Sequence, residues 1–282
     1  MMRCKRLPKS KKCHHRGTEG TEFVKKNLRV LRVSVVIPLL FFLFAACNGR
    51  ASAWPRIQQE GVLRVGLDPT YPPFEVDAGG ELTGLDVDLA RAIGADLGLE
   101  VAFSYFGYDG LYDALATGQV DVLLSALVVD PLRTKDFAYS EPYFNAGQIL
   151  LVPEGETAVS AMPDLANRIL AVELGAQSHV EALEWSRKLA GLTVLPFTTP
   201  EEALTAVLEG QADAALIDGV NGRLFLRDTP GLTHTTDPIT VEPYALVTRI
   251  EDGELLDQLN DSLERLQASG ELRSIITNWL GE

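Results

Sequence analysis

The chain has 282 residues, with 25 Lys and Arg, 39 Asp and Glu, and a formal net charge of −14 at pH 7. Residues 1–46 hold 11 of the basic residues and 2 of the acidic ones, which leaves −23 for the remaining 236 residues. That charge argues against nucleic acid as a partner and mildly favours a neutral or cationic solute. The length is ample for a buried core.

A hydrophobic segment lies near the N-terminus. Val33–Ala46 (VSVVIPLLFFLFAA) follows four basic residues between positions 25 and 32 and ends in small residues before Cys47. It has the length of a signal-peptide core and is shorter than the roughly 20 residues of a spanning helix. We therefore expect residues 1–46 to be a signal peptide and residues 47–59 a tether.

Cysteine and histidine usage predicts neither disulfides nor metal. No cysteine follows Cys47, and His179 and His234 lie near no cysteine or second histidine. Near the N-terminus, two cysteines and two histidines form only a weak metal-binding pattern: Cys4, Cys13, His14 and His15. Phosphate loops, dinucleotide fingerprints and nucleophile elbows are absent from the sequence, so we expect no cofactor.

The first half of the exported part alternates between strand-like and helix-like segments. The strand-like segments are Val62–Leu67, Val101–Phe106 and Asp121–Ala126, and the helix-like ones are Gly84–Leu97 and Asp109–Thr117. Such alternation predicts a parallel sheet covered by helices.

The second half repeats this alternation. Strand-like Ile169–Leu174, Thr193–Phe197 and Ala212–Ile217 alternate with helix-like His179–Ala190 and Pro200–Leu208. We therefore expect a second α/β unit of the same kind.

An internal echo supports two related units. DALATGQVDVLL (Asp113–Leu124) matches TAVLEGQADAAL (Thr205–Leu216), each a helix end, Gly-Gln, an Asp and an apolar strand. Gly118 and Gly210 suit the left-handed position that ends a helix. The pattern occurs twice, which indicates two lobes rather than a solenoid.

Two segments connect the units. Gln148–Pro153 (QILLVP) is typical of a crossing strand, Val241–Thr248 (VEPYALVT) of a return, and Asp252–Leu280 of a helical end broken near Gly270. We predict lobe 1 from residues 60–149 and 245–282, and lobe 2 from residues 150–244.

Arg133 follows the break of a buried strand. Asp121–Leu127 is apolar enough for the middle of a sheet, and Asp130-Pro131 ends it. A guanidinium beyond the carboxyl end of a strand lies where open α/β sheets bind ligands and fits a carboxylate in two-point fashion. The alternative is a surface arginine paired with Asp130 or Asp136.

Four motifs around Arg133 occur in a known order. They are VLRVGLDPTYPPFE from 62, GLDVDLARAIGADLG from 84, GYDGLYDALATGQVDV from 107 and RTKDFAYSEPYF from 133. Between about Arg56 and Leu280 the chain resembles the bacterial extracellular solute-binding proteins of family 3, which deliver amino acids to ABC importers. The resemblance implies a type II periplasmic-binding-protein fold, in which two α/β lobes joined by a two-strand hinge close on a ligand. It also implies a non-enzymatic monomer and, as partners, an amino acid and ABC permease subunits.

The leader resembles that of a lipoprotein. LFAAC, ending at Cys47, looks like a lipobox, so the resemblance implies an acylated Cys47 and an extracytoplasmic protein anchored to the cell membrane. Phe44 stands where leucine is usual, and secretion with a cut near Ala53 remains the alternative.

The resemblance assigns a carboxylate site. Arg133 matches the family arginine, and the backbone N–H groups of Gln177 and Ser178 would complete the cradle at a helix start. A helix cap by Ser178 is the alternative. Ala126 belongs to the same ligand-binding set, and Val128 replaces the usual Ser or Thr, which removes one hydroxyl contact.

An ammonium site is implied opposite. Asp218 matches the family aspartate that faces Arg133 across the cleft, since a buried ammonium needs an anionic partner. The carbonyl of Ser125 would accept another ammonium proton. The alternatives are a helix-capping Asp218 and a Ser125 that is simply a small strand residue.

The side-chain pocket would be built from two acids and three aromatic residues: Asp68, Tyr71, Phe74, Tyr108 and Glu173. The aromatic rings would sandwich the ligand stem or stack on a guanidinium, with core packing as the alternative. Two carboxylates favour a basic ligand side chain, although Asp68 alone is equally a turn cap.

The remaining acids carry no predicted function. We expect Glu75, Asp86, Asp88 and Glu141 to be solvated or capping residues. Two alternative functions remain: a cyclohexadienyl or prephenate dehydratase-like enzyme with Glu173 as general acid, and a ligand-sensing module for a separate partner.

Overall fold

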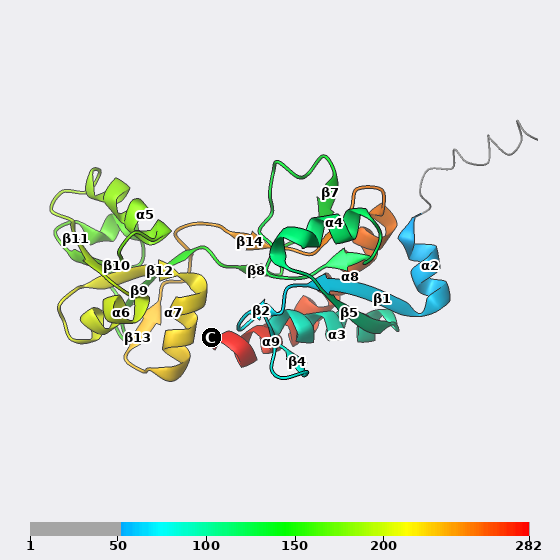
Figure 1. Cartoon of the computed structure of the whole chain (residues 1–282). Helices are drawn as coiled ribbons and strands as arrows, with labels where there is room; N and C mark the ends of the chain where they lie inside the picture. Colours follow the sequence, from blue (N-terminus) through cyan, green and yellow to red (C-terminus); the bar gives the residue numbers. More distant parts are fainter. Residues whose placement is uncertain (1–51, 282) are drawn as a thin grey trace, which may run out of the picture. The chain divides into compact units, whose positions relative to one another are not determined.

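The computed structural model describes residues 52–281 (Figure 1). The predicted signal peptide, the lipidation site Cys47 and residues 47–51 of the predicted tether lie outside the described residues. Among the described helices, none combines the length and apolar character needed to cross a membrane. Within residues 52–281, no group of three or more His, Cys, Asp or Glu side chains is arranged to hold a metal ion.

The first sheet is mixed rather than parallel. Its order is β5–β1–β6–β15–β7, with β1 parallel to β5 and β6, and β15 antiparallel to β6 and β7. The strands are β1 (Val62–Leu67), β5 (Glu100–Tyr105), β6 (Val122–Leu123), β7 (Phe137–Tyr139) and β15 (Val247–Arg249). The three strands predicted from the alternation, β1, β5 and β6, are parallel as expected, and β15, which returns late in the chain to pair beside β6, makes the complete sheet mixed.

Strand β6 is also shorter than the predicted Asp121–Ala126. The backbone of Ala126 adopts φ +46°, which is left-handed and ends the extended conformation. Ser125–Val128 is consequently an irregular segment beyond the carboxyl end of β6, the central strand of the sheet, and it becomes part of the candidate site.

Helices cover both faces of this sheet. They are α2 (Ala53–Glu60), α3 (Leu85–Leu97), η1 (Tyr108–Gly110), α4 (Leu111–Ala116), α8 (Gly253–Ser269) and α9 (Glu271–Leu280). Val122 packs with residues of α3 and α8, whereas the next residue, Leu123, packs with α4, because successive strand side chains point to opposite faces. The predicted break at Gly270 is confirmed, with φ +83° between α8 and α9.

A small three-stranded sheet lies between β1 and α3 in the chain. It consists of β2 (Thr70–Tyr71), β3 (Glu75–Asp77) and β4 (Leu82–Thr83), paired antiparallel in that order. It carries the aromatic loop of the candidate site on one side and leads into α3 on the other.

The second sheet has the order β11–β10–β12–β9–β13 and is likewise mixed. Its strands are β9 (Gln148–Pro153), β10 (Ile169–Glu173), β11 (Thr193–Phe197), β12 (Ala214–Asp218) and β13 (Leu232–His234). The segment predicted to cross between the lobes, β9, lies inside this sheet and runs antiparallel to β12 and β13.

Helices again pack on both faces of the second sheet (Figure 1). They are η2 (Met162–Leu165), α5 (Gln177–Ser186), α6 (Pro200–Leu208) and α7 (Gly219–Asp228). Leu170 and Val172 of β10 join Ala182 of α5, while Ala171 between them joins Leu204 of α6. The left-handed glycines predicted by the internal echo are present, with φ +77° at Gly118 and +72° at Gly210.

The two sheets are connected through a short paired segment. Strand β8 (Phe144–Asn145) pairs antiparallel with β14 (Pro243–Tyr244). The rings of Phe144 and Tyr244 lie 5.6 Å and 5.3 Å from the ring of Phe74, so the connection packs against the first lobe. The lobe boundaries given above stay a prediction.

Candidate functional site

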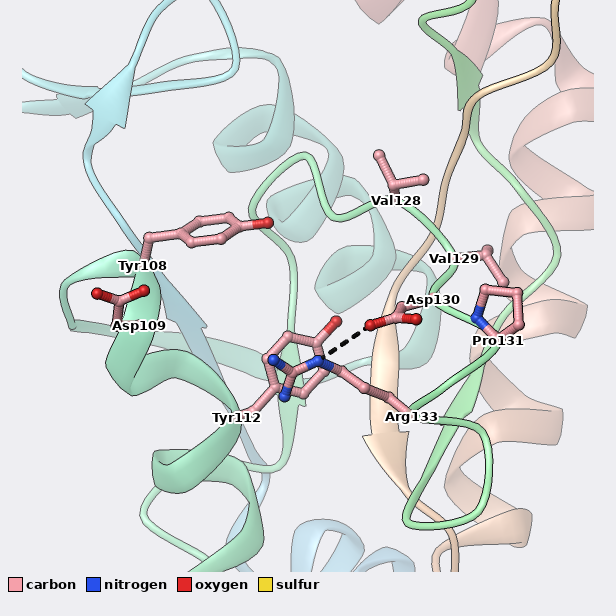
Figure 2. A pocket seen from close by; sticks show the side chains of 8 residues that line it. All are labelled: Tyr108, Asp109, Tyr112, Val128, Val129, Asp130, Pro131 and Arg133. Carbon is pink, nitrogen blue, oxygen red and sulfur yellow. Dashed lines mark ion pairs between the residues drawn. The ribbon is translucent and has the colours of Figure 1, made fainter.

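A pocket of about 420 Å³ surrounds Arg133 in the first lobe (Figure 2). The turn after β6 positions this residue, since the Arg133 N–H donates to the carbonyl of Asp130 at 3.0 Å. The walls come from η1, from α4 and from the segment after β6: Tyr108, Asp109, Tyr112, Val128, Val129, Asp130 and Pro131. The volume is within the usual range for small-molecule sites, roughly 300–1,000 Å³.

Two contacts hold the guanidinium of Arg133. Its carbon lies 4.1 Å from the centre of the Tyr112 ring, and its Nε lies 3.3 Å from Oδ2 of Asp130 (Figure 2). Among residues 52–281, neither Nη1 nor Nη2 has a hydrogen-bond or ion-pair partner. The side chain is 48% exposed, so two donors are free to meet a carboxylate.

The expected alternative, a surface pair with Asp130, is thus present together with the pocket. The pair engages only Nε, and its members are half-exposed, so its contribution to stability is small, roughly 1 kcal/mol or less. A bound carboxylate would use the opposite edge of the fork.

Tyr112 is a site residue that our sequence reasoning missed. Its hydroxyl lies 3.1 Å from that of Tyr139, and burial together with this contact raises its pKa. The phenol stays neutral and presents its face to Arg133. The available signal was spacing, because Tyr112 lies four residues after Tyr108 and on the same side of a helical turn.

The segment after β6 offers backbone groups to the pocket. Val128 is 41% exposed and forms an isolated antiparallel bridge with Tyr244. The side chain of Ser125 is buried, and within the described part of the chain no donor reaches its carbonyl oxygen. Ser125 is not among the residues that line the pocket, so its contact with a ligand ammonium stays a prediction.

Asp68 ties two loops together. Its Oδ1 accepts from the Thr70 hydroxyl at 2.9 Å, and its Oδ2 accepts from the backbone N–H of Tyr108 at 2.8 Å. The expected turn-capping alternative is therefore observed, and the carboxylate also fixes the start of η1. Tyr108 is 61% exposed at the pocket wall.

The aromatic loop is layered. Tyr71 is 44% exposed and stacks on Phe74 with centroids 5.5 Å apart and ring planes 7° apart. Phe74 is fully buried, so the structure places it behind Tyr71 instead of at the pocket surface. Burial raises the pKa of the Tyr244 phenol most, and its interaction with Tyr71 raises that pKa further.

In the second lobe, Asp218 ends β12 and caps α7. Its Oδ1 accepts from the backbone N–H groups of Val220 at 3.1 Å and Asn221 at 2.9 Å, and its Oδ2 accepts from Nδ2 of Asn221 at 2.8 Å. The helix-cap interpretation is thus observed, and Oδ2 retains a lone pair. The predicted apposition of Asp218 and Arg133 stays a prediction.

Glu173 ends the neighbouring strand, β10. Burial raises its pKa most, and the negative charges of Asp218 and Glu201 raise it further. The second sheet therefore presents two acids, Glu173 and Asp218, at the carboxyl ends of adjacent parallel strands.

The start of α5 lies just beyond Glu173. Ala176 occupies the N-cap position, and its side chain accepts no capping hydrogen bond. Ser178 is buried inside the first turn of the helix, so the alternative in which Ser178 caps the helix is wrong. In the described structure, the backbone N–H groups of Gln177 and Ser178 have no acceptor. Such free donors at a helix start suit an anion.

Two acids expected at the surface are instead in the core. Glu75 is 1% exposed and Asp86 is fully buried, because β3 and the first turn of α3 pack against Ser125 and Tyr143. Asp88 and Glu141 are solvated as expected, with Asp88 accepting from the indole of Trp279 at 2.8 Å.

Two α/β lobes joined by paired strands are the architecture of a type II periplasmic binding protein, and solved structures share this fold. The first lobe carries the arginine with two nitrogens unpaired among the described residues, and the second lobe carries the adjacent acids. The chain belongs to the bacterial extracellular solute-binding proteins, family 3, whose model matches residues 63–282. Membership indicates an extracytoplasmic location.

The relatives agree in extent and fold. The L-cystine-binding protein TcyJ of Escherichia coli strain K12 is 28% identical over 234 residues, which are 80% of this chain and 85% of that protein. The unliganded, open L-cystine solute receptor of Neisseria gonorrhoeae is 25% identical with a TM-score of 0.73, over 82% of this chain and 98% of that one. An ancestral cationic amino acid solute-binding protein is 32% identical with a TM-score of 0.61, over 81% and 100%.

One solved relative has an enzyme's name. An ancestral cyclohexadienyl dehydratase is 26% identical with a TM-score of 0.71, covering 83% of this chain and 99% of that one. The fold is therefore shared between binding proteins and an enzyme, and the site has to distinguish them.

Proposed function

We propose that this protein binds an amino acid for delivery to an ABC importer, with Arg133 holding the ligand carboxylate. The observation that carries the proposal is the guanidinium in its pocket, half-exposed and with Nη1 and Nη2 unpaired among the described residues. The free N–H groups at Gln177 and Ser178 would complete the anion site.

We further propose a preference for basic side chains. Glu173 and Asp218 end adjacent strands, and burial first and the charge of Asp218 second raise the pKa of Glu173, so a ligand cation would relieve an existing electrostatic cost. The α-ammonium would meet Asp218 and the Ser125 carbonyl, and the basic tail would meet Glu173. The name of the ancestral cationic amino acid-binding relative supports this preference.

The proposed partners are permease subunits of the importer and the membrane, reached through a lipid on Cys47. The monomer would close on its ligand about the β8–β14 connection, where Phe74 packs against both strands. These assignments rest on the family and on the leader sequence.

We propose binding without turnover. A dehydratase would use Glu173 as a general acid on a carboxylate substrate, but Asp218 on the adjacent strand would repel such an anion. The test is turnover of prephenate by the purified protein. A rate that disappears in Glu173→Gln would instead support the enzyme.

A thermal-shift screen tests the binding proposal. The exported protein is melted with each of the twenty amino acids, ornithine, citrulline and L-cystine, because a ligand that binds only the native state raises Tm by mass action. Arginine, lysine or ornithine should give the largest shifts. Shifts with Asp or Glu alone would contradict the basic preference. Every ligand that raises the Tm of wild type should leave the Tm of Arg133→Ala unchanged.

A further inference from the structure

Two buried carboxyl groups lie directly behind the Ser125–Ala126 segment. The Ser125 hydroxyl donates to Oε1 of Glu75 at 2.6 Å, and the Ala126 N–H donates to Oδ2 of Asp86 at 2.6 Å. These acids come from different elements, β3 and the first turn of α3. Each therefore anchors one residue of the same irregular segment.

Each acid has a second oxygen that is buried and has no hydrogen-bond partner among the described residues: Oε2 of Glu75 and Oδ1 of Asp86. The two carboxyl groups also interact electrostatically, because after burial the charge of Asp86 is the next cause that raises the pKa of Glu75. Two carboxylates would repel there, whereas one proton between them satisfies both oxygens.

The surrounding groups determine which acid keeps the proton. Asp86 accepts from the backbone N–H of Ala126 and lies in the first turn of α3, and both features favour its carboxylate. Glu75 has only the Ser125 hydroxyl as a donor and also faces the charge of Asp68.

No cation compensates the pair. Within residues 52–281, no Lys, Arg or His makes a hydrogen bond or ion pair with Glu75 or Asp86. The neighbouring titratable groups are Asp68, Tyr143 and, beyond Tyr143, Tyr244. Burial is the largest influence on both carboxyl groups, and it raises the pKa of each.

The anchored segment is conformationally unusual. Ala126 has φ +46°, a conformation that non-glycine residues hold only when their surroundings enforce it. Two hydrogen bonds hold the Ser125–Ala126 peptide in this conformation. One joins the Ala126 N–H to Asp86, and the other joins the Ser125 hydroxyl to Glu75. The Ser125 hydroxyl also accepts from the Asp68 N–H at 3.0 Å, which joins the start of the aromatic loop to the same network.

We propose that Glu75 and Asp86 share one proton and act as positioning residues that hold the Ser125–Ala126 edge of the ligand site in its binding conformation. The inference rests on the proposed function for its ligand. A neutral Glu75 donates to the Asp86 carboxylate, and the segment stays fixed while one negative charge is kept beneath the place proposed for an ammonium.

The first test needs no ligand. A native acid with a raised pKa stabilises the fold at low pH and loses that contribution as pH rises toward the folded pKa. Glu75→Gln keeps a donor and an acceptor but cannot ionise. The Tm of wild type should therefore fall relative to the Tm of Glu75→Gln as the pH rises from 5.5 to 9. Glu81→Gln, an exposed site after β3, is the control and should track wild type. Parallel curves for Glu75→Gln and wild type would overturn the shared proton.

The second test measures positioning. At pH 7.5, Glu75→Gln should bind L-arginine within about twofold of wild type, and Glu75→Leu, which supports neither bond, should bind at least about tenfold more weakly while its circular dichroism stays native. Wild-type affinity in a folded Glu75→Leu would overturn the proposal.

A third measurement separates this inference from the proposed function. If wild type does not bind L-arginine, the basic-ligand proposal fails, and amide exchange at Ala126 replaces the binding assay. Exchange at that N–H should accelerate at least about tenfold in Glu75→Leu and stay near wild type in Glu75→Gln. Equal exchange in all three proteins would overturn the positioning role.

Discussion

The guanidinium carbon of Arg133 lies 4.1 Å from the centre of the Tyr112 ring. The ring supports the flat face of the fork, and Asp130 engages Nε, so the free Nη1 and Nη2 edge is held in one plane. Stacking of this kind orients the donors before a carboxylate arrives, which lowers the entropic cost of binding.

Removing the ring should weaken binding without removing the charge. Tyr112→Leu is expected to reduce amino-acid affinity about 2- to 30-fold, the range of one cation–π contact. Tyr112→Phe is the matched control, because it keeps the ring and loses only the 3.1 Å contact with the Tyr139 hydroxyl. Calorimetric titration should place Tyr112→Phe near wild type. Equal losses in both variants would assign the effect to the hydroxyl pair.

Asp218 combines a structural role with a proposed ligand contact, and two substitutions separate them. Asn is as good a helix cap as Asp, so Asp218→Asn should leave the unfolding free energy within about 0.5 kcal/mol and still lower affinity at least tenfold, about 1.4 kcal/mol. Asp218→Ala should lose the same affinity and also about 1 kcal/mol of stability. If Asp218→Asn binds like wild type, the carboxylate only caps α7.

Local patterns predicted much of this architecture. The internal echo located both left-handed glycines, and Asp130-Pro131 correctly marked the turn that leads to Arg133. The antiparallel pairing of β15 was not predictable in the same way, because β15 pairs with β6 from more than a hundred residues away in the chain. Local periodicity indicates a strand and contains no information about its partner.

The buried acids show a second limit of the sequence. Glu75 and Asp86 belong to residue types that are rarely buried, so a solvated position was the reasonable expectation. Their burial depends on β3, α3 and the segment after β6 meeting in space. Each acid becomes acceptable in the core only through partners, Ser125 and Ala126, that lie about 40 to 50 residues away in the chain.

Affinity for a basic ligand should fall as pH is lowered, and Glu173 is the reason. Burial and neighbouring acids raise its pKa, so it gains a proton at a higher pH than an ordinary Glu and then no longer attracts a cation. Between pH 7.5 and 5, wild type should lose more affinity for L-arginine than Glu173→Gln does. Glu184→Gln, an exposed acid on α5, should behave as wild type. A pH dependence unchanged in Glu173→Gln would move the tail contact elsewhere.

Gly84 sets the distance between the aromatic loop and α3, so a methyl group there should be strongly destabilising. A Cβ at this position would lie 2.0 Å from the Phe74 carbonyl oxygen, and φ is +140°. Gly84→Ala should therefore cost at least about 3 kcal/mol of unfolding free energy and displace Phe74 and Glu75 together. Gly80→Ala is the control, since its φ of +98° is also unfavourable but no atom lies within 4 Å of the added Cβ. Its cost should be only about 1–2 kcal/mol. Chemical denaturation measures both, and equal costs would show that backbone conformation, not the contact with Phe74, decides the effect.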